Sequence, residues 1–213
     1  VFAWGYHFQQ KSIVLEDQEQ YKIYAENLRT HGIFSLKPEY GSDAMRTPIY
    51  PLYILLFQSF ASSLIPLFLS QIILGTIASV MTYYLARLVT TKTVAWLAAL
   101  LFSLETEHII ISSLIRTEPL FMVLWLGAFI LFFNYFRTSS RNVLYAALTG
   151  LLLGLATLTR PFTQLVPFIF VLFALLPFTR PQSFTFPLRK IALHMSMMVG
   201  VFILVLAPWI IRN

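Results

Sequence analysis

The side chains in this sequence that could do chemistry are carboxylates and guanidinium groups, and they stand in few places. All nine acidic residues fall in two segments, 16–43 and 105–118. The middle of every long apolar stretch lacks Asp, Glu, Lys and Arg. Cysteine is absent, which excludes a disulfide framework, a thiolate metal site and a cysteine nucleophile. The pattern therefore favours acid–base chemistry at the ends of the apolar stretches over chemistry inside them.

Four residues are candidates for such chemistry, and each also has a simpler structural interpretation. Asp17 is followed three residues later by Gln20, which is the spacing of a capping box, so helix capping is sufficient for it on pattern alone. Glu118 opens an apolar segment, where a carboxylate stabilises the helix dipole. Arg46 can be an interfacial arginine that reaches lipid headgroups. Arg160 can be a topological stop between two apolar segments.

The composition predicts helices in a bilayer. Hydrophobic residues make up 58% of the 213 residues, charged residues make up 11%, and the mean hydropathy is +0.74. A soluble domain of this size could not bury so much apolar surface. The formal charge of +6 comes from basic residues scattered at the ends of apolar stretches, which indicates topology signals and not a nucleic-acid patch. We expect an all-α polytopic membrane protein that binds no nucleic acid.

The chain divides into a polar N-terminal part and an apolar remainder. Residues 1–8 are apolar and begin with Val, so we expect the end of a truncated first transmembrane helix and a fragment of a longer protein. An outer loop is expected over 9–48, with an amphipathic helix at 17–31, and a juxtamembrane helix over 49–62. Within 63–213 we expect six transmembrane helices, at about 66–89, 93–111, 118–136, 143–159, 161–178 and 191–211.

Basic residues in the short connections predict which side faces the cytoplasm. Three alternate connections carry basic residues and no acid: Arg87 and Lys92; Arg137 and Arg141; Arg180, Arg189 and Lys190. The positive-inside rule assigns these connections to the cytoplasmic side. The two acidic segments then share the opposite side, so we expect the candidate chemistry at the outer face of the membrane.

An ordered series of short motifs runs through the chain. It consists of Asp17-x-x-x-Tyr21-x-x-x-Ala25-Glu26-Asn27-Leu28, Gly32-Ile33-Phe34-Ser35, Arg46-Thr47-Pro48-Ile49-Tyr50-Pro51, Arg116-Thr117-Glu118, the run GLLLGLATLTRP over 150–161, and Ala207-Pro208-Trp209 followed by Arg212-Asn213. The series resembles the superfamily of dolichyl-phosphate-mannose protein mannosyltransferases and aminoarabinose transferases. That superfamily has the GT-C fold, a transmembrane helix bundle with juxtamembrane helices in an outer loop. The resemblance is specific to the superfamily and not to any substrate.

The resemblance implies roles for the four candidates. In the family an Asp at the start of the loop helix is the proposed general base for the acceptor, and Asp17 is the matching position. Glu118 matches a second acidic residue of the active site. Arg46 matches a basic residue that contacts the lipid phosphate, and Arg160 is a second candidate for that contact. Sugar transfer from a phosphate-linked donor needs a base near the incoming hydroxyl and cations on the departing phosphate, which agrees with these roles.

The resemblance also bears on the substrate pocket and on metals. Tyr21 and Tyr50, which lie in the matched motifs, are expected in the substrate pocket. In aminoarabinose transferases an acidic residue that helps to hold zinc immediately precedes the phosphate-binding residue, whereas this chain has Met45 there. The sequence therefore assigns no metal ligand and no certain cofactor, although a divalent metal stays an open alternative. His31 and His108 are the outer-side candidates for another metal site.

The implied activity is an inverting transfer of sugar from a polyprenyl-phosphate lipid to an acceptor hydroxyl, at the periplasmic face of a bacterial inner membrane. Lipid A, a protein, a glycan and a free lipid are all open as acceptors. A polytopic transporter or channel is the first alternative, but such proteins usually place ionisable residues near the middle of the membrane. An inactive membrane scaffold with the same fold is the second.

Overall fold

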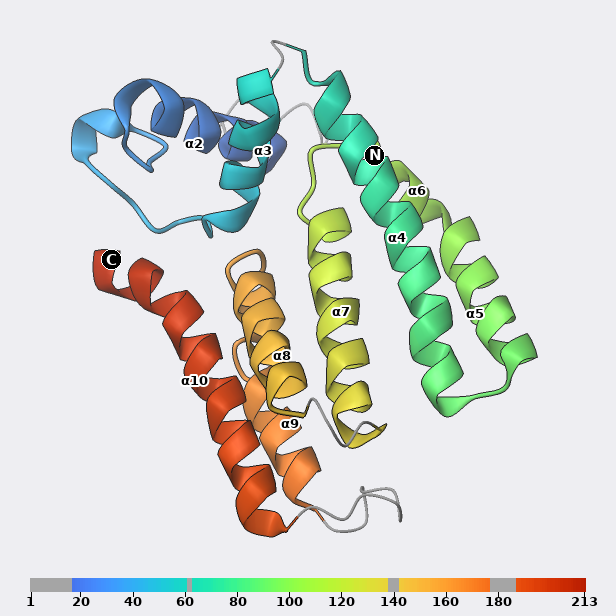
Figure 1. The fold of residues 1–213 in the computed structure, drawn as a ribbon. Helices are drawn as coiled ribbons and strands as arrows, with labels where there is room; N and C mark the ends of the chain where they lie inside the picture. The colour runs from blue at the N-terminus through green and yellow to red at the C-terminus, as the bar shows by residue number, and fades with distance from the viewer. Residues whose placement is uncertain (1–16, 61–62, 138–141, 177–186) are drawn as a thin grey trace, which may run out of the picture.

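The computed structural model describes residues 17–60, 63–137, 142–176 and 187–213, and the elements in these ranges are all helical (Figure 1). The helices are α2 (Asp17–His31), η1 (Pro38–Tyr40), α3 (Ile49–Phe60), α4 (Ile65–Val89), α5 (Lys92–Leu104), α6 (Thr106–Ser112), α7 (Glu118–Arg137), α8 (Asn142–Thr157), η2 (Pro161–Thr163), α9 (Val166–Leu175) and α10 (Leu188–Arg212). The expected all-α class is confirmed. The transmembrane helix end expected at 1–8 lies outside the described residues.

Three of the described helices, α4, α7 and α10, are long and apolar enough to cross a bilayer. Helices α5 and α6 pass the same test only as a pair, with a bend of 54° between them. The bend lies at Glu105, whose carboxylate accepts hydrogen bonds from the N–H groups of Glu107 at 3.1 Å and His108 at 2.6 Å and so caps α6. The segment 93–111, which the sequence predicted as one helix, is therefore two helices.

The two other expected spans, 143–159 and 161–178, correspond to the shorter apolar helices α8 and α9. The 16 residues of α8 extend about 24 Å, less than the ~30 Å of a hydrocarbon core. Both helices pack into the largest hydrophobic core, where Leu153 of α8 is fully buried and Phe170 of α9 stacks on Phe132 of α7 at 4.1 Å. The last two residues of 161–178 lie outside the described part of the chain.

Helices α8 and α10 approach each other closely through small residues. A Cβ atom added at Gly150 would lie 2.1 Å from the carbonyl oxygen of Met198, and one added at Gly154 would lie 2.7 Å from Cβ of Val205. The sequence shows why this contact is permitted, since Ala146, Gly150 and Gly154 recur every four residues on one helix face.

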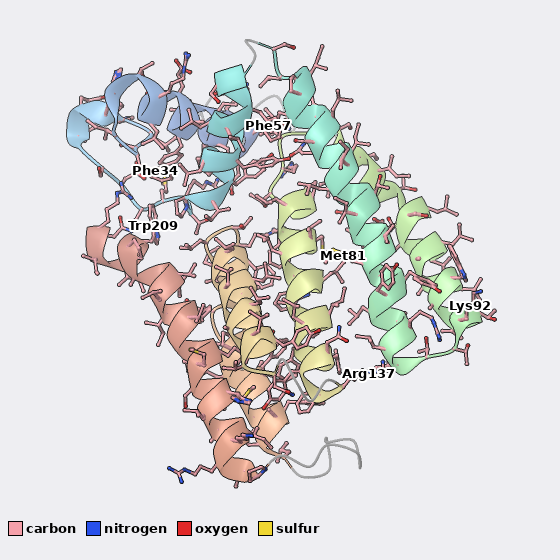
Figure 2. The ribbon with its side chains drawn as sticks, in the orientation of Figure 1. Phe34, Phe57, Met81, Lys92, Arg137 and Trp209 are labelled. Carbon is pink, nitrogen blue, oxygen red and sulfur yellow. The ribbon has the colours of Figure 1, made fainter. Side chains whose placement is uncertain are left out.

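The two ends of the bundle differ in character (Figures 1 and 2). One end carries α2, α3, the start of α7 and the end of α10, and we call it the loop end. The opposite end carries the turn between α4 and α5, with Lys92, and the end of α7, with Arg137. There Arg137 donates through Nη1 to the carbonyl of Leu88 at 3.3 Å, which ties α7 to α4. We call this the basic end; Arg141 and Arg180, expected on the same side, lie outside the described residues.

At the loop end, α2 packs on α3, and the two helices share a buried cluster with the start of α4. Tyr21 and Ala25 of α2 join Tyr50 and Ile54 of α3 in a second buried cluster that also contains Leu67 of α4. The exposed side of α2 carries ion pairs between residues three positions apart, as expected of an amphipathic helix. The apolar stripe of α2 is therefore anchored to the bundle through this cluster.

The contact between α8 and α10 predicts that Gly150→Ala destabilises the protein, because the new methyl group would meet backbone atoms of Met198. We expect a cost of about 1–3 kcal/mol and a lower thermal unfolding midpoint of the purified full-length protein in detergent. Gly200→Ala is the matched control, since no atom lies within 4 Å of a Cβ added there. Equal midpoints for the two variants would contradict this account of the contact.

Candidate functional site

A pocket of ≈ 490 Å³ opens at the loop end of the bundle. Its walls come from segments far apart in the sequence: Tyr21 of α2, residues 44–47 before α3, residues 116–118 at the start of α7, residues 159–162 from the end of α8 into η2, and Trp209 of α10. The pocket brings together Arg46, Glu118, Arg160 and Tyr21, which were predicted from the sequence as site residues. Their proximity is a result of packing.

Arg160 and Glu118 form an ion pair across the pocket. Nη1 of Arg160 lies 3.1 Å from Oε1 of Glu118, and the two side chains are only 37% and 25% exposed. The guanidinium also lies over the rings of Phe121 and Phe162, at 5.9 and 5.7 Å from their centroids. Glu118 therefore orients Arg160 within the pocket. Stabilisation of the dipole of α7 alone would not account for this contact.

Arg46 is held by helix α2. Its Nε donates to Oε1 of Gln20 at 2.9 Å, and its guanidinium lies over the ring of Tyr21 at 5.2 Å from the centroid. The capping-box spacing had suggested Gln20 as a partner for the start of α2, and the structure shows its side-chain oxygen turned to Arg46. An arginine held on one edge and on one face has a well-defined direction.

Two hydrogen bonds join the loop that carries Arg46 to the segment that carries Arg160. The hydroxyl of Thr47 donates to the carbonyl of Thr159 at 3.0 Å, and the N–H of Ile49 donates to the carbonyl of Leu158 at 3.2 Å. These carbonyls follow the last turn of α8, where helical partners are lacking. The bonds therefore satisfy buried backbone carbonyls that lack helical partners, and they place the two arginines at one pocket.

Arg116 is a third arginine in the pocket, and it was not among the site residues predicted from the sequence. It lines the wall two residues before Glu118 in the Arg-Thr-Glu motif, which is the signal that could have identified it. Arg46, Arg116 and Arg160 with the single carboxylate of Glu118 give the described lining residues a formal charge of three minus one, or +2. A pocket with this charge and several guanidinium donors suits a phosphate group.

The two remaining candidates are Asp17, which is described by its position in α2, and Tyr50, which is described with its side chain. Asp17 is the first residue of α2, four residues before Tyr21 in the pocket wall, and its side chain lies outside the described part of the structure. Tyr50 does not line the pocket. It is fully buried behind Tyr21, with ring centroids 5.0 Å apart, and its hydroxyl donates to Oε1 of Gln71 at 2.6 Å. Burial raises the pKa of Tyr50, so it serves as a neutral support for the wall.

The residues beside Arg46 do not fit the zinc site of the aminoarabinose transferases. Met45 has its side chain 72% exposed, and Asp43 is already engaged in hydrogen bonds. His31 is exposed at the end of α2, and His108 lies apart from it in α6. Among the described side chains, no group of three from His, Cys, Asp and Glu could hold a metal ion. The donor set therefore supports no step through zinc at this position.

Asp43 organises the loop that forms one wall of the pocket. Its carboxylate accepts hydrogen bonds from the Tyr24 hydroxyl, the Ser35 hydroxyl at 3.0 Å, and the N–H groups of Leu36 at 2.9 Å and Met45 at 3.1 Å. Burial raises the pKa of Asp43, but these hydrogen bonds together lower it by more, and the net shift is downward. The ionised carboxylate is therefore the form that stabilises the loop.

The same loop is attached to the end of α10 by Arg212. This arginine donates through Nη2 to the carbonyl of Phe34 at 3.0 Å, and its guanidinium lies 4.7 Å from the Trp209 ring centroid. Phe34 and Trp209 are in edge-on contact at 5.2 Å, side by side at the loop end in Figure 2. Because Trp209 also lines the pocket, α10 supports the wall and the loop at once.

A family model described as Dolichyl-phosphate-mannose-protein mannosyltransferase matches residues 53–213, which are 161 of the 213 residues. The matched region contains the pocket segments 116–118 and 159–162 and Trp209, and it begins after Arg46. Comparisons with curated proteins and with solved structures give no significant match.

The lowered pKa of Asp43 predicts a pH-dependent loop. The pKa of Asp43 in the folded protein lies below its unfolded value of about 3.9, so the unfolded loop binds more protons. The stabilisation by Asp43 is therefore complete at neutral pH. It is lost as the pH falls through the folded pKa. Asp43→Asn should weaken the loop by about 1.5–3 kcal/mol at pH 7, since the charge-assisted bonds are lost. Faster limited proteolysis within 32–46 in reconstituted protein would measure this.

Glu39→Gln is the control for this experiment, because Glu39 is an exposed acid of the same loop with its carboxylate outside the Asp43 network. The difference in cleavage between Asp43→Asn and the unchanged protein should shrink at acidic pH. Equal cleavage of the two proteins at pH 7 would show that Asp43 does not organise the loop.

Proposed function

The chain belongs to the dolichyl-phosphate-mannose-protein mannosyltransferase family, and on that premise we propose that its pocket transfers a sugar from a polyprenyl-phosphate lipid to an acceptor hydroxyl at the outer face of the membrane. The family consists of membrane glycosyltransferases with polyprenyl-phosphate donors, and the apolar helices agree with a multi-pass membrane protein. The outer-face location is supported by the basic residues at the opposite end of the bundle.

The observation that carries this proposal is the convergence of Arg46, Arg116 and Arg160 on one pocket at the end of an apolar bundle. The phosphate of a sugar-phosphate lipid carries one negative charge while it is a diester, and about −1.5 to −2 after the sugar has left. The described lining residues, with a formal charge of +2, therefore match the departing phosphate better than the bound donor. Such differential stabilisation of developing charge is a major source of catalysis.

In the proposed reaction, the carboxylate of Asp17 takes the proton of the acceptor hydroxyl, and the hydroxyl oxygen attacks the anomeric carbon from the side opposite the phosphate. The bond between that carbon and the phosphate oxygen breaks, and its electron pair leaves with the phosphate. The arginines bind this oxygen as its charge grows. The configuration at the anomeric carbon inverts, and the sugar is joined to the acceptor.

Helix α2 suits the role given to Asp17. It carries Asp17 one turn before Tyr21, which lines the pocket, and Tyr21 is packed against the bundle. Glu118 has a supporting part, since it pairs with Arg160 and orients that guanidinium. Lipid A, a protein, a glycan and a free lipid are the acceptor classes to compare in an assay.

We expect Asp17→Asn in the full-length protein to reduce sugar transfer from a polyprenyl-phosphate donor by about 10²–10⁴-fold, with membrane expression intact, because the amide cannot take the acceptor proton. Radiolabelled sugar transfer in reconstituted membranes measures this. Glu19→Gln is a matched control, since Glu19 lies on the same helix and is paired with Lys22 at the surface. Undiminished transfer by Asp17→Asn would remove Asp17 from the mechanism.

Arg116→Gln tests the arginine that only the structure identified. The substitution removes one of the three arginines among the described lining residues, so we expect kcat/KM for the lipid donor to fall about tenfold or more. Arg87→Gln at the basic end of the bundle should leave kcat/KM unchanged. Equal values of kcat/KM for the two variants would exclude Arg116 from donor binding and from catalysis.

A further inference from the structure

We propose that a second pocket, between α4 and the bent pair of helices α5 and α6, binds the free hydroxyl group of an uncharged membrane lipid. We call it the α4–α6 pocket. None of its described lining residues also lines the pocket of the three arginines. The proposal therefore stands independently of sugar transfer.

The α4–α6 pocket has a volume of ≈ 540 Å³ and lies against the middle of α4. The 54° bend between α5 and α6 opens it, because Ser103 before the bend and residues between 108 and 113 after it line the space. Helix α4 contributes Gly75. A Cβ atom added there would lie 3.1 Å from Oγ of Ser112 and 3.2 Å from Nε2 of His108. The bend and the glycine together therefore make the pocket.

His108 places an unpartnered nitrogen in this pocket. Its Nε2 is buried and has no hydrogen-bond partner among the described residues. Its ring is held by Phe102 of α5, with ring centroids 4.6 Å apart. A buried polar atom without a partner costs free energy, and the cost is greatest where the surroundings are apolar. The nitrogen therefore calls for a ligand group that can form a hydrogen bond with it.

Five hydroxyl groups line the same pocket, and all of them already donate to the backbone. Each bonds at 2.7 to 3.1 Å to a carbonyl three or four residues earlier; they belong to Thr76, Ser79, Ser103, Ser112 and Ser113. A hydroxyl has one hydrogen and two lone pairs, so in this arrangement these groups offer a ligand only acceptors. The described lining residues include no Asp, Glu, Lys or Arg.

A ligand hydroxyl satisfies both kinds of group. It can donate to a serine or threonine oxygen while it accepts from Nε2–H of His108, or donate to Nε2 in the other tautomer. A carbonyl or ether oxygen could use only Nε2. A phosphate would need several donors and a positive charge, which the described lining residues do not supply. The pocket therefore fits an uncharged hydroxyl group.

The rim of the pocket shows from where the ligand comes. The side chains of Ile72, Val80, Ile109 and Ile110 line the pocket and are 50 to 54% exposed. Helix α4 is long and apolar enough to cross the bilayer, and α5 with α6 passes the same test as a bent pair. Exposed apolar side chains on such helices face hydrocarbon. A ligand that enters through this rim is therefore a lipid.

An apolar groove continues from the pocket and suits the chain of that lipid. It has a volume of ≈ 400 Å³, shares Ser79, Val80 and Ser103 with the α4–α6 pocket, and reaches Tyr83 and Trp96. The groove thus runs along α4 and α5 toward the basic end, whereas α6 lies beside the start of α7 (Figure 1). A lipid would lie with its hydroxyl group toward the loop end and its chain toward the membrane interior.

The test uses photo-crosslinking in phosphatidylcholine nanodiscs that contain the purified full-length protein. The probe is a diacylglycerol with a diazirine in one acyl chain. Its methyl ether is the control lipid, because it has the same chains and no hydrogen to donate. The half-saturating mole fraction of each lipid is measured from the labelling of residues 79–113. The variants are His108→Leu and Gly75→Ala, and His31→Leu at the exposed end of α2 is the matched control.

We expect diacylglycerol to half-saturate the unchanged protein at about a tenfold lower mole fraction than its methyl ether, because the hydroxyl group supplies the partner of Nε2. His108→Leu should bring this ratio to about one, while both lipids still label the groove. Gly75→Ala should weaken diacylglycerol binding about tenfold, since its methyl group takes the space beside Nε2. His31→Leu should keep the tenfold ratio. Thermal unfolding midpoints, measured in parallel, show that each variant is folded.

Three outcomes would overturn the proposal. Equal half-saturation by the two lipids in the unchanged protein would leave water as the partner of Nε2. A tenfold ratio that persists in His108→Leu would place the hydroxyl group elsewhere. Stronger competition by phosphatidylethanolamine or phosphatidylglycerol than by unlabelled diacylglycerol would show that the pocket selects a charged headgroup.

Discussion

The hydrogen bonds from Thr47 and Ile49 to the carbonyls of Thr159 and Leu158 are the contact on which the rest of the site depends. They join the loop before α3 to the end of α8, across 112 residues of sequence for the pair Thr47–Thr159. The end of a helix leaves carbonyl groups without helical partners, and in a membrane protein such groups need partners from elsewhere in the chain. Satisfying them here also brings Arg46 and Arg160 to one pocket. The same two hydrogen bonds therefore satisfy backbone carbonyls and assemble the site.

The pocket concentrates positive charge at the end of an apolar bundle, and Arg160 and Arg46 have different kinds of neighbour. Arg160 has a carboxylate and two aromatic rings, whereas Arg46 has an amide oxygen and one ring. A guanidinium is more weakly hydrated than an ammonium, so it tolerates such partly buried positions. The supporting wall relies on the same chemistry, since Arg212 lies on Trp209 and holds the loop organised by Asp43. The result is a pocket whose described lining residues carry a net positive charge.

Several features of the fold and of the site could be predicted from local patterns, and others could not. The small-residue spacing at Gly150 and Gly154 predicted a close helix contact, because small side chains permit it wherever the partner helix lies. Hydropathy did not reveal the bend at Glu105, because the cap that breaks the helix depends on one carboxylate turning back to two N–H groups. Tyr50 was expected in the pocket, and packing against Tyr21 and Gln71 placed it behind the wall.

By itself, the sequence determined that the protein is an all-α membrane protein and which polar segments could carry chemistry, because hydropathy and charge act through composition and local spacing. Its ordered motifs also indicated the family that the match over 53–213 establishes. Only the tertiary structure decided that Arg46, Arg116 and Arg160 share a pocket, that Glu118 pairs with Arg160, and that Gln20 turns to Arg46. The physical reason is that these contacts join segments that helix packing brings together, and no local pattern encodes a distance between residues so far apart in the chain.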